Sequence, residues 1–297
     1  MTLRNRSASP RIAVFTDKID WHVEKTLRAF AQLGARAIPV RLGACKFDTR
    51  RPGGLAIPGF HQLPDAAVVR AIGDGTLEMI TMRLGVLHAL EALGVPVANS
   101  ARCIERCTDK SMATFLVAKA GAPTPETFVA QTTAQAMDIA RRECPKGPLV
   151  AKPLFGAQGW GLRLIRRPEN MPTQEEIRGV FYLQRFVPRR GPQYEDTRIL
   201  ISGGEPIGAM RRRSNHWITN VRQGAKPFAV APTPRETELA MTAARALGAD
   251  CAGVDLIEGD DGPLVLEVNS MPGWFGLQKV VEFDIAQRLA EDVLKQV

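Results

Sequence analysis

Short apolar runs alternate with stretches of helical periodicity over the first hundred residues. Residues 12–16 form one such run, and Val23, Leu27 and Phe30 then recur at helical spacing before Gly34. The pattern predicts further strands at 37–42, 66–72 and 95–97, a loop rich in glycine and proline at 50–64, and a helix at 77–90. This alternation of strand and helix is typical of a parallel sheet flanked by helices.

Beyond residue 120 the pattern changes to strands joined by short turns. A predicted helix at 108–120 is followed by Pro123 and Pro125, which favour an extended segment. The remaining pattern predicts helices at 134–142, 236–247 and 285–293, and strands at 149–154, 162–166, 181–187, 197–202, 206–213, 252–257 and 264–268. The short connections between these strands indicate mainly antiparallel sheets.

Length and composition indicate a folded protein of more than one domain. The chain has 297 residues, of which 45% are hydrophobic and 24% are charged, and domains average about 150 residues. The formal net charge is +8, so the surface is expected to attract anions such as phosphates, polycarboxylates or nucleic acids. The basic residues occur in scattered pairs rather than in one long run, which disfavours nucleic acid as the partner.

The cysteines and the N-terminal residues bear on the cellular compartment. Five cysteines are an odd number, and no apolar leader precedes the first predicted strand, so we expect a cytoplasmic protein without disulfides. Cys103 and Cys107 have no second Cys or His pair that could complete a zinc site. No run approaches the roughly 18 apolar residues of a membrane span, so no membrane partner is expected.

The strongest chemical signal lies in two predicted strands joined by a turn at 259–262. Glu267 and Asn269 are two residues apart on one strand, so their side chains leave the same face. If the turn has an odd number of residues, Asp255 lies opposite Glu267 on that face. Such oxygen ligands suit Mg²⁺ or Mn²⁺ bound to substrate phosphates. The alternative is that the acids are solvated or paired with arginine, which their apolar neighbours disfavour.

A second signal is a glycine loop between two predicted strands. Lys152 precedes Gly156, Gly159 and Gly161. Glycines allow backbone N–H groups to approach phosphate oxygens closely, and a lysine supplies a compact positive charge. The order differs from the Walker and GxGxxG patterns. The loop therefore indicates either a phosphate-binding loop or a mobile hairpin turn.

Three consecutive arginines follow on another predicted strand. Because side chains alternate between the faces of a strand, either Arg211 and Arg213 or Arg212 alone would point toward the acidic residues. A fixed guanidinium could bind a carboxylate and stabilise the negative charge that develops during acyl transfer. The alternative is an exposed basic edge strand.

In order and spacing, these segments resemble the ATP-grasp fold, and within it the RimK family of ATP-dependent α-L-glutamate ligases. The resemblance extends from about residue 65 onward and rests on VVRAIGDG, the DK pair at 109–110, VAKPLFGAQGWG, YLQRFV, DTRILISGG, residues 220–224, AGVDLI and LVLEVNSMPG. It implies an α/β protein with an N-terminal parallel subdomain (1–105), a central lobe (106–186) and a C-terminal lobe (187–297). Both lobes would contain antiparallel sheets, with ATP held between them.

The resemblance also implies roles for individual residues. Asp255, Glu267 and Asn269 would hold Mg²⁺ or Mn²⁺, and Arg198 and Arg212 would be catalytic residues near the reacting groups. Residues 184–187 would form the hinge that faces adenine, with Asp196 near the ribose. The complete set of implied ATP-binding residues is Lys110, Lys152, Gly156, Gln158, Gly159, Gly161, Gln184, Arg185, Phe186, Val187 and Asp196. The implied substrate-binding residues are Arg70, Asn220 and Arg222.

Two positions depart from the pattern of the family. The hinge of the family often carries an acid, where this chain has Arg185. An arginine often stands two residues before the site asparagine, where this chain has Ile218 before Asn220. These differences concern contacts to ribose and phosphate and the nature of the acceptor.

The reaction that the resemblance implies joins an acceptor carboxylate to the amine of L-glutamate. The carboxylate attacks the γ-phosphate of ATP, and the amine then displaces phosphate from the acyl phosphate, so that catalysis depends on positioning and charge neutralisation. Residues 70–90 are more similar to members that glutamylate tetrahydromethanopterin-like or other C1 coenzymes. The alternatives are glutamylation of a protein C-terminus, another carboxylate–amine ligation, or non-catalytic binding of a nucleotide or RNA. A homo-oligomer also remains open.

Overall fold

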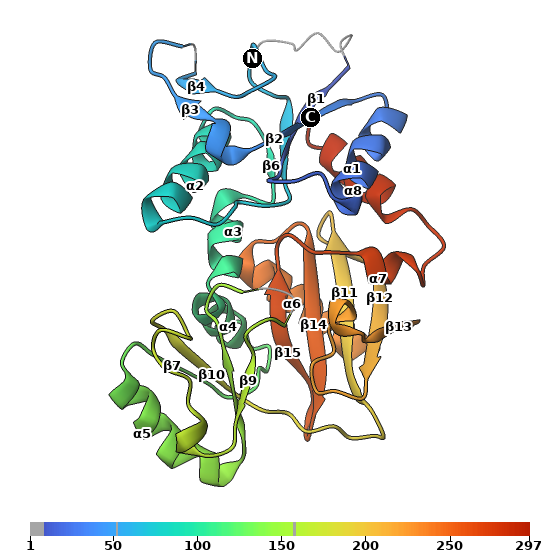
Figure 1. The fold of residues 1–297 in the computed structure, drawn as a ribbon. Helices are drawn as coiled ribbons and strands as arrows, with labels where there is room; N and C mark the ends of the chain where they lie inside the picture. Colours follow the sequence, from blue (N-terminus) through green and yellow to red (C-terminus); the bar gives the residue numbers. More distant parts are fainter. Residues whose placement is uncertain (1–8, 52, 157–158) are drawn as a thin grey trace.

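The computed structural model describes residues 9–51, 53–156 and 159–297, which form three parts (Figure 1). The N-terminal subdomain contains a parallel sheet in the order β2-β1-β5-β6. Its main elements are β1 (Arg11–Phe15), α1 (Trp21–Gln32), β2 (Arg36–Val40), β5 (Ala66–Val69), α2 (Leu77–Ala92) and β6 (Val97–Ala98). Strand β1 lies inside the sheet and is buried from Ile12 onward, which explains its continuous apolar sequence.

The central lobe is a small antiparallel sheet covered by one helix. Its strands follow the order β7-β10-β8-β9. The elements are β7 (Thr127–Ala130), α5 (Thr133–Glu143), η2 (Cys144–Lys146), β8 (Leu149–Lys152), β9 (Arg163–Ile165), η3 (Pro168–Asn170) and β10 (Phe181–Arg185). The buried apolar cluster of this lobe lies entirely within residues 130–183.

The C-terminal lobe is built on an antiparallel sheet in the order β13-β12-β11-β14-β15. Its elements are β11 (Tyr194–Ser202), β12 (Glu205–Ser214), η4 (Val221–Gln223), β13 (Lys226–Ala229), α6 (Pro234–Leu247), β14 (Ala252–Gly259), β15 (Gly262–Asn269) and α7 (Phe275–Gln278). Helix α6 packs on one face of this sheet through its alanine and leucine side chains. The other face is therefore available to the neighbouring parts of the chain.

Packing departs from the expected ranges 1–105, 106–186 and 187–297 at two places. Helices α3 (Ala101–Thr108) and α4 (Lys110–Lys119) pack against α6 and β15, so residues near 106–122 belong to the core of the C-terminal lobe rather than to the central lobe. Helix α8 (Ile285–Leu294), at the C-terminal end, packs on α1 of the N-terminal subdomain (Figure 1). Its apolar residues join the cluster of β1 and α1.

Several elements differ from the sequence-based prediction. The helix predicted at 108–120 is α4, and the preceding α3 was not predicted; Asp109 ends α3, and its carboxylate accepts hydrogen bonds from the first turn of α4. The predicted loop at 50–64 contains β4 (Leu55–Ala56), which pairs with β3 (Lys46–Phe47) after η1 (Leu42–Ala44). Strand β13 was not predicted because three of its four residues are exposed and leave no apolar alternation.

The predicted pairing of Asp255 with Glu267 is confirmed, but by a different geometry of the hairpin. The turn of β14 and β15 has two residues, Asp260 and Asp261, rather than an odd number. The register then shifts by one between Asp255 and Leu256, so that Leu266 is the extra residue of a β-bulge. The bulge therefore supplies the odd residue that brings the two carboxylates opposite each other.

No helix in the described ranges is long and apolar enough to cross a membrane.

Asn99 connects the N-terminal subdomain to the sheet of the C-terminal lobe. Its side chain accepts a hydrogen bond from Cys251 N at 2.9 Å and donates to Cys251 O at 2.6 Å and Ser270 O at 2.7 Å. Asn99 is 1% exposed, so no water can replace these bonds without a rearrangement.

We therefore expect Asn99→Leu to lower the free energy of unfolding by about 2–4 kcal/mol, because buried backbone groups lose their partners. Urea denaturation followed by circular dichroism measures this change. The exposed Asn215, changed to leucine, serves as the control and should alter stability by less than about 0.5 kcal/mol. Equal effects of the two substitutions would contradict a connecting role for Asn99.

Candidate functional site

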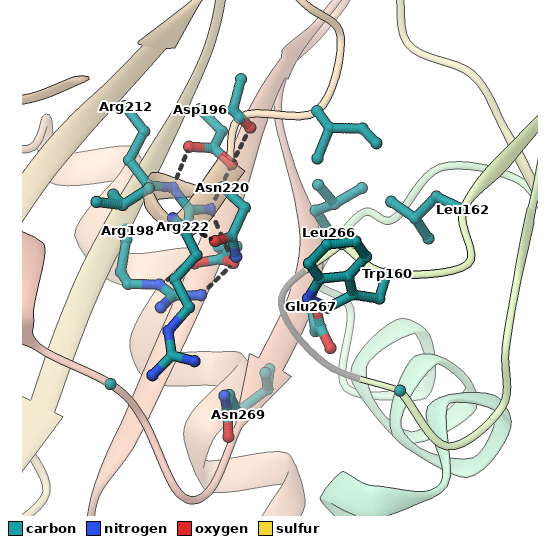
Figure 2. A pocket seen from close by; sticks show the side chains of 18 of the residues that line it. Trp160, Leu162, Asp196, Arg198, Arg212, Asn220, Arg222, Leu266, Glu267 and Asn269 are labelled. Carbon is teal, nitrogen blue, oxygen red and sulfur yellow. Dashed lines mark hydrogen bonds and ion pairs between the residues drawn. The ribbon is translucent and has the colours of Figure 1, made fainter. Parts of the chain in front are cut away.

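A single cleft of about 1710 Å³ is lined by residues of all three parts of the chain. The C-terminal sheet contributes one wall, on the face opposite α6. Figure 2 shows Trp160 and Leu162 facing this wall from the glycine loop and the start of β9. The N-terminal subdomain contributes residues that follow the ends of β1 and β5. The cleft therefore lies where the three parts meet.

Polar side chains from four strands share the cleft face of the C-terminal sheet. Arg198 on β11 pairs in register with Asp255 on β14, which pairs with Glu267 on β15. Asp196 pairs with Arg212 on β12, and lies two residues from Arg198. Side chains in register or two apart leave the same face, so these residues form one polar group (Figure 2).

Arg212 is the member of the arginine run that points into this group. Arg211 and Arg213 lie on the other face, where both form ion pairs with Glu195, at 3.9 and 2.6 Å. This outcome is the second of the two orientations expected from the alternation of side chains. Arg212 is 4% exposed, so it is buried in the wall rather than part of an exposed basic edge.

Asp255 shares its carboxylate between two guanidinium groups. Arg198 Nε and Nη2 donate to Asp255 Oδ1 and Oδ2 at 2.6 and 2.7 Å, and Arg212 Nη2 lies 2.9 Å from Oδ2. Burial alone would raise the pKa of Asp255, but the two arginines outweigh burial and lower the pKa to about 2. Asp255 is therefore a carboxylate at physiological pH, and it fixes both arginines in place.

Asp196 plays a similar part for Arg212. Arg212 Nε donates to Asp196 Oδ1 at 2.6 Å, Arg212 Nη2 contacts Oδ2, and Thr219 Oγ1 donates to Oδ2 at 2.7 Å. Asp196 is 4% exposed and both its oxygens are engaged. The ribose contact expected for Asp196 would thus compete with these bonds, and the observed contacts orient Arg212 instead.

Two lysines face the acidic residues across the cleft. Lys152 at the end of β8 donates from Nζ to Gln184 Oε1 at 2.6 Å, and Lys110 Nζ lies 3.6 Å from Glu267 Oε1. Lys110 Nζ also donates to Gly156 O at 2.7 Å, which links the start of α4 to the glycine loop. Burial lowers the pKa of Lys152 to about 8, against the attraction of Glu267.

The predicted hinge at 184–187 lines the cleft, but the side chains of its residues point in different directions. Gln184 is 1% exposed, and its amide nitrogen donates to Thr127 Oγ1 and to Tyr182 Oη at 3.1 Å. Phe186 stacks edge-on with Tyr194 and Trp217, at ring distances of 6.4 and 6.0 Å. These two aromatic residues extend the apolar wall beside the hinge and were not singled out from the sequence, where isolated aromatics carry no spacing signal.

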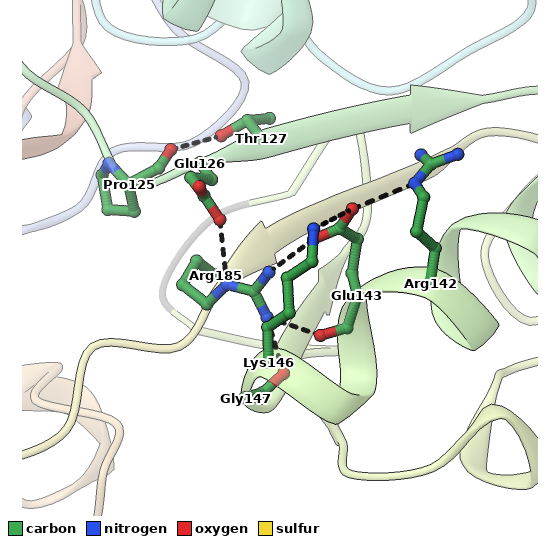
Figure 3. A network of polar contacts seen from close by, with 8 residues as sticks. All are labelled: Pro125, Glu126, Thr127, Arg142, Glu143, Lys146, Gly147 and Arg185. Atoms are coloured by element: carbon green, nitrogen blue, oxygen red, sulfur yellow. Dashed lines mark hydrogen bonds and ion pairs between the residues drawn. The ribbon is translucent and has the colours of Figure 1, made fainter.

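Arg185 points into the central lobe, toward Glu126, Glu143 and Gly147 (Figure 3). Its Nη1 donates to Gly147 O at 2.6 Å and to Glu143 O at 3.0 Å, while Nη2 donates to Glu143 Oε2 at 2.9 Å. Nε donates to Glu126 Oε2 at 3.1 Å. The positive charge at this hinge position is thus neutralised inside the lobe, and the backbone N–H of Arg185 donates to Glu126 O at 2.7 Å.

The remaining predicted residues lie around the same cleft. Gly156, Gly159, Val187 and Arg70 line it, and so do Asn220 and Arg222 near η4. Asn220 Oδ1 accepts a hydrogen bond from Arg222 N at 2.9 Å. Gly161 lies in the same loop with φ of +75°, where a Cβ would approach Pro153 Cγ to 2.8 Å. Gln158 lies outside the described residues.

The oxygen ligands on β14 and at the end of β15 fit a hard divalent cation that is also bound by substrate oxygens. Glu267 has a side chain that is 40% exposed, and Asn269 Oδ1 accepts one hydrogen bond, from Met271 N at 2.9 Å. Asp255 keeps fewer acceptor positions, because three arginine nitrogens contact it. Among the described residues no group of three or more His, Cys, Asp and Glu side chains could hold a metal alone. Protein and phosphate oxygens together are the usual environment of Mg²⁺.

The chain is similar to proteins of a known family. A model of the RimK-like ATP-grasp domain matches residues 107–293. The chain belongs to the RimK-like ATP-grasp family. A tetrahydromethanopterin:α-L-glutamate ligase of Methanococcus maripaludis is 36% identical over 77% of this chain and 78% of the relative. The corresponding protein of Methanosarcina acetivorans is 32% identical over 88% of this chain and 91% of the relative.

Solved structures of low sequence identity show the same fold. The ATP-grasp ligase PsnB, complexed with a precursor variant, Mg and ADP, gives a TM-score of 0.75 at 19% identity and covers 96% of this chain and 98% of PsnB. The RimK domain protein of Sphaerobacter thermophilus gives a TM-score of 0.69 at 23% identity, over 96% and 99% of the two chains. These structures support the ATP-grasp fold, and the family match with its glutamate ligase relatives identifies the chain as an ATP-dependent ligase.

The pKa of Lys152 predicts that nucleotide binding depends on pH. Lys152 loses its positive charge above about pH 8, so phosphate binding should weaken as the pH rises through this value. We expect the affinity for ADP, measured by calorimetry in the presence of EDTA, to fall about tenfold between pH 7 and pH 9. Lys152→Met should weaken binding and flatten this dependence, whereas exposed Lys119→Met should preserve it. A flat wild-type profile would show that Lys152 does not contact phosphate.

The network around Arg185 predicts a stabilising role in the central lobe. Arg185→Gln leaves the buried Glu143 with fewer partners and should lower the free energy of unfolding in urea by about 2–4 kcal/mol. Arg142 also contacts Glu143, but its side chain is 62% exposed. Arg142→Gln should therefore cost less than about 1 kcal/mol. Equal free energies of unfolding for the two variants would show that the contacts of Arg185 do not stabilise the central lobe.

Proposed function

We propose that this RimK-like ligase joins a carboxylate of a small coenzyme to the amine of L-glutamate through an acyl phosphate. The observation that carries the proposal is the convergence of two lysines, two arginines and a row of oxygen ligands on one cleft. The names of the archaeal relatives support a tetrahydromethanopterin-like or other C1 coenzyme as the acceptor. The positive net charge of +8 suits substrates that are all anions.

ATP binds between the central and C-terminal lobes in this proposal. Lys110 and Lys152 contact its phosphates, and the glycine loop at 156–161 covers them. The hinge at 184–187 faces the adenine, with the apolar side of Phe186 beside it. Asp196 lies on the nucleotide side of the cleft, where its main role is to orient Arg212 by accepting a hydrogen bond from it.

Glu267 and Asn269, with Asp255 beside them, would hold Mg²⁺ in this proposal, because Glu267 lies 3.6 Å from Lys110, which is proposed to bind phosphate. When bound, Mg²⁺ supplies positive charge that offsets the charge on the phosphates. The lysines contribute to the same neutralisation, so the protein holds the anionic substrates close together without a covalent intermediate on the enzyme.

The transfer takes place in two steps beside Arg198 and Arg212. An oxygen of the acceptor carboxylate bonds to the γ-phosphorus, and ADP leaves. The glutamate nitrogen then bonds to the acyl carbon, phosphate leaves, and the nitrogen loses a proton. The arginines stabilise negative charge on the acyl oxygen and phosphate, and Asp255 holds Arg198 in a fixed direction for this purpose. Asn220 and Arg222 lie on the same wall and are proposed to contact substrate.

Product analysis tests the substrates. The purified protein is incubated with ATP, Mg²⁺, glutamate and one candidate acceptor, and the products are analysed by mass spectrometry. We expect a mass increase of one or more glutamyl units on a coenzyme acceptor, together with ADP release. Glutamylation confined to a protein C-terminus or a peptide would assign the acceptor differently, and nucleotide or RNA binding without turnover would exclude a ligase with these substrates.

Glu267→Gln tests the metal-binding role. We expect ADP release to fall by at least about 100-fold, because a neutral amide binds Mg²⁺ far less well than a carboxylate does. Glu205 provides a matched control, since it is an exposed glutamate on β12 outside the lining of the cleft. Glu205→Gln should retain wild-type turnover. Near-normal turnover of Glu267→Gln would remove Glu267 from the active site.

A further inference from the structure

The N-terminal sheet reverses its strand order beside the cleft. Strand β1 leads to β2 on one side, and the chain then crosses back to place β5 on the other side of β1. In open parallel sheets, ligands bind outside the carboxyl ends of the strands at such a reversal. Residues 16–18, which follow β1, and 70–72, which follow β5, line the cleft. The crevice of this sheet is therefore continuous with the candidate active site.

Arg70 brings a positive charge to this crevice, where the nearby carboxylate of Asp20 attracts it without forming an ion pair. Its backbone N–H donates to Phe15 O at 2.8 Å, and its guanidinium lies 4.6 Å from the ring centroid of Trp274. Nη2 donates to Pro272 O at 2.8 Å, whereas Nε is buried and has no hydrogen-bond partner. Within the described part of the chain, no carboxylate forms an ion pair with Arg70.

The neighbouring polar groups make their hydrogen bonds with other partners, although the charge of Asp20 acts on Arg70. Asp20 accepts hydrogen bonds from two backbone amides in the first turn of α1. His22 Nε2 accepts from two successive backbone amides, beginning with Trp274, at 3.1 and 3.2 Å. Burial and the charge of Arg70 lower the pKa of His22 to about 4, so the imidazole is neutral and holds Trp274 beneath Arg70. A negatively charged substrate group would find in Arg70 a fixed and partly unsatisfied donor.

Arg70 lies one short loop away from the proposed reacting groups. Pro272 follows Asn269 by three residues, and three residues span at most about 10 Å. Pro272 also lies beside Arg198, because a Cβ at Gly253 would be 3.1 Å from Pro272 Cβ and 3.6 Å from Arg198 Nε. A carboxylate held by Arg70 would thus be about one amino-acid length from the site of transfer.

We propose that Arg70 binds a carboxylate of the glutamate substrate that the reaction leaves unchanged, a role that rests on the proposed function. Glutamate has two such carboxylates, while its amine forms the new bond. The buried crevice beside Trp274 suits a small amino acid. The larger acceptor would enter through the open mouth of the cleft, where Leu77 and Trp160 are 78% and 68% exposed.

Substitution of Arg70 combined with a series of amines tests this role. We expect Arg70→Gln to raise the KM for glutamate by about 10- to 100-fold, as for loss of a charged hydrogen bond. The KM values for ATP and acceptor should stay within about twofold. The wild type should discriminate glutamate from its α-amide or its γ-amide, and Arg70→Gln should lose this discrimination. An unchanged KM for glutamate, or a rise confined to the KM for the acceptor, would overturn the proposal.

Two further variants separate binding from folding. Arg141→Gln, on the exposed surface of α5, is the control and should behave like wild type. Arg70→Lys keeps the charge but not the planar pair of donors, and should give an intermediate KM. Arg70→Gln should stay close to the unfolding temperature of the wild type, because removal of a buried charge offsets the loss of the hydrogen bond to Pro272 O. Added glutamate should raise that temperature for the wild type only.

A binding experiment separates failure of the role of Arg70 from failure of the proposed ligase function. If the wild type releases no ADP with any acceptor, calorimetric titration of glutamate in the presence of ADP and Mg²⁺ still tests Arg70. Binding by the wild type that is at least about tenfold weaker in Arg70→Gln supports the carboxylate site alone. Equal binding, or none in either protein, overturns it.

Discussion

The site depends on one carboxylate that two arginines share. Asp255 is buried on β14 of the C-terminal sheet. It contacts Arg198 on the adjacent strand β11 and Arg212 on β12, the next strand along. Asp196 balances the second positive charge, so two acids and two guanidinium groups neutralise one another inside the wall. Removing any one of them leaves a buried charge without its partner, which is more costly than the loss of a surface ion pair. Arg198 and Arg212 therefore keep fixed positions on the sheet because the two buried carboxylates that bind them are themselves fixed.

Much of this arrangement follows from rules of strand geometry. Side chains alternate between the two faces of a strand. This alternation predicts that Glu267 and Asn269 share a face and that Arg212 lies on the opposite face from Arg211 and Arg213. The position of the bulge at Leu266 does not follow from such rules, because it depends on packing around the hairpin. The contacts of Arg185 could not be predicted either, since Glu126 and Glu143 are 59 and 42 residues away in sequence. Long-range partners of a polar residue leave no periodic trace in the sequence.

The fold shows the same division between local and long-range information. Helices with clear caps and apolar stripes, such as α5 and α6, were predicted close to their observed bounds. Short or exposed elements, such as β13, have no such pattern. Helix α4 was predicted as a helix, but its packing on α6 rather than in the central lobe follows only from tertiary contacts. Local order could be predicted from the sequence, whereas membership of a core could not.

The position of α8 has a consequence for synthesis of the protein on the ribosome. The apolar cluster that joins β1 and α1 also contains Ile285, Ala286 and Ala290, near the C-terminal end of the chain. Helix α1 covers part of the apolar face of β1 at once, but the cluster is complete only after α8, far along the chain, has been synthesised. The central lobe, whose cluster lies within 130–183, can complete its core much earlier. The N-terminal subdomain therefore completes this apolar cluster later in synthesis than the central lobe completes its own.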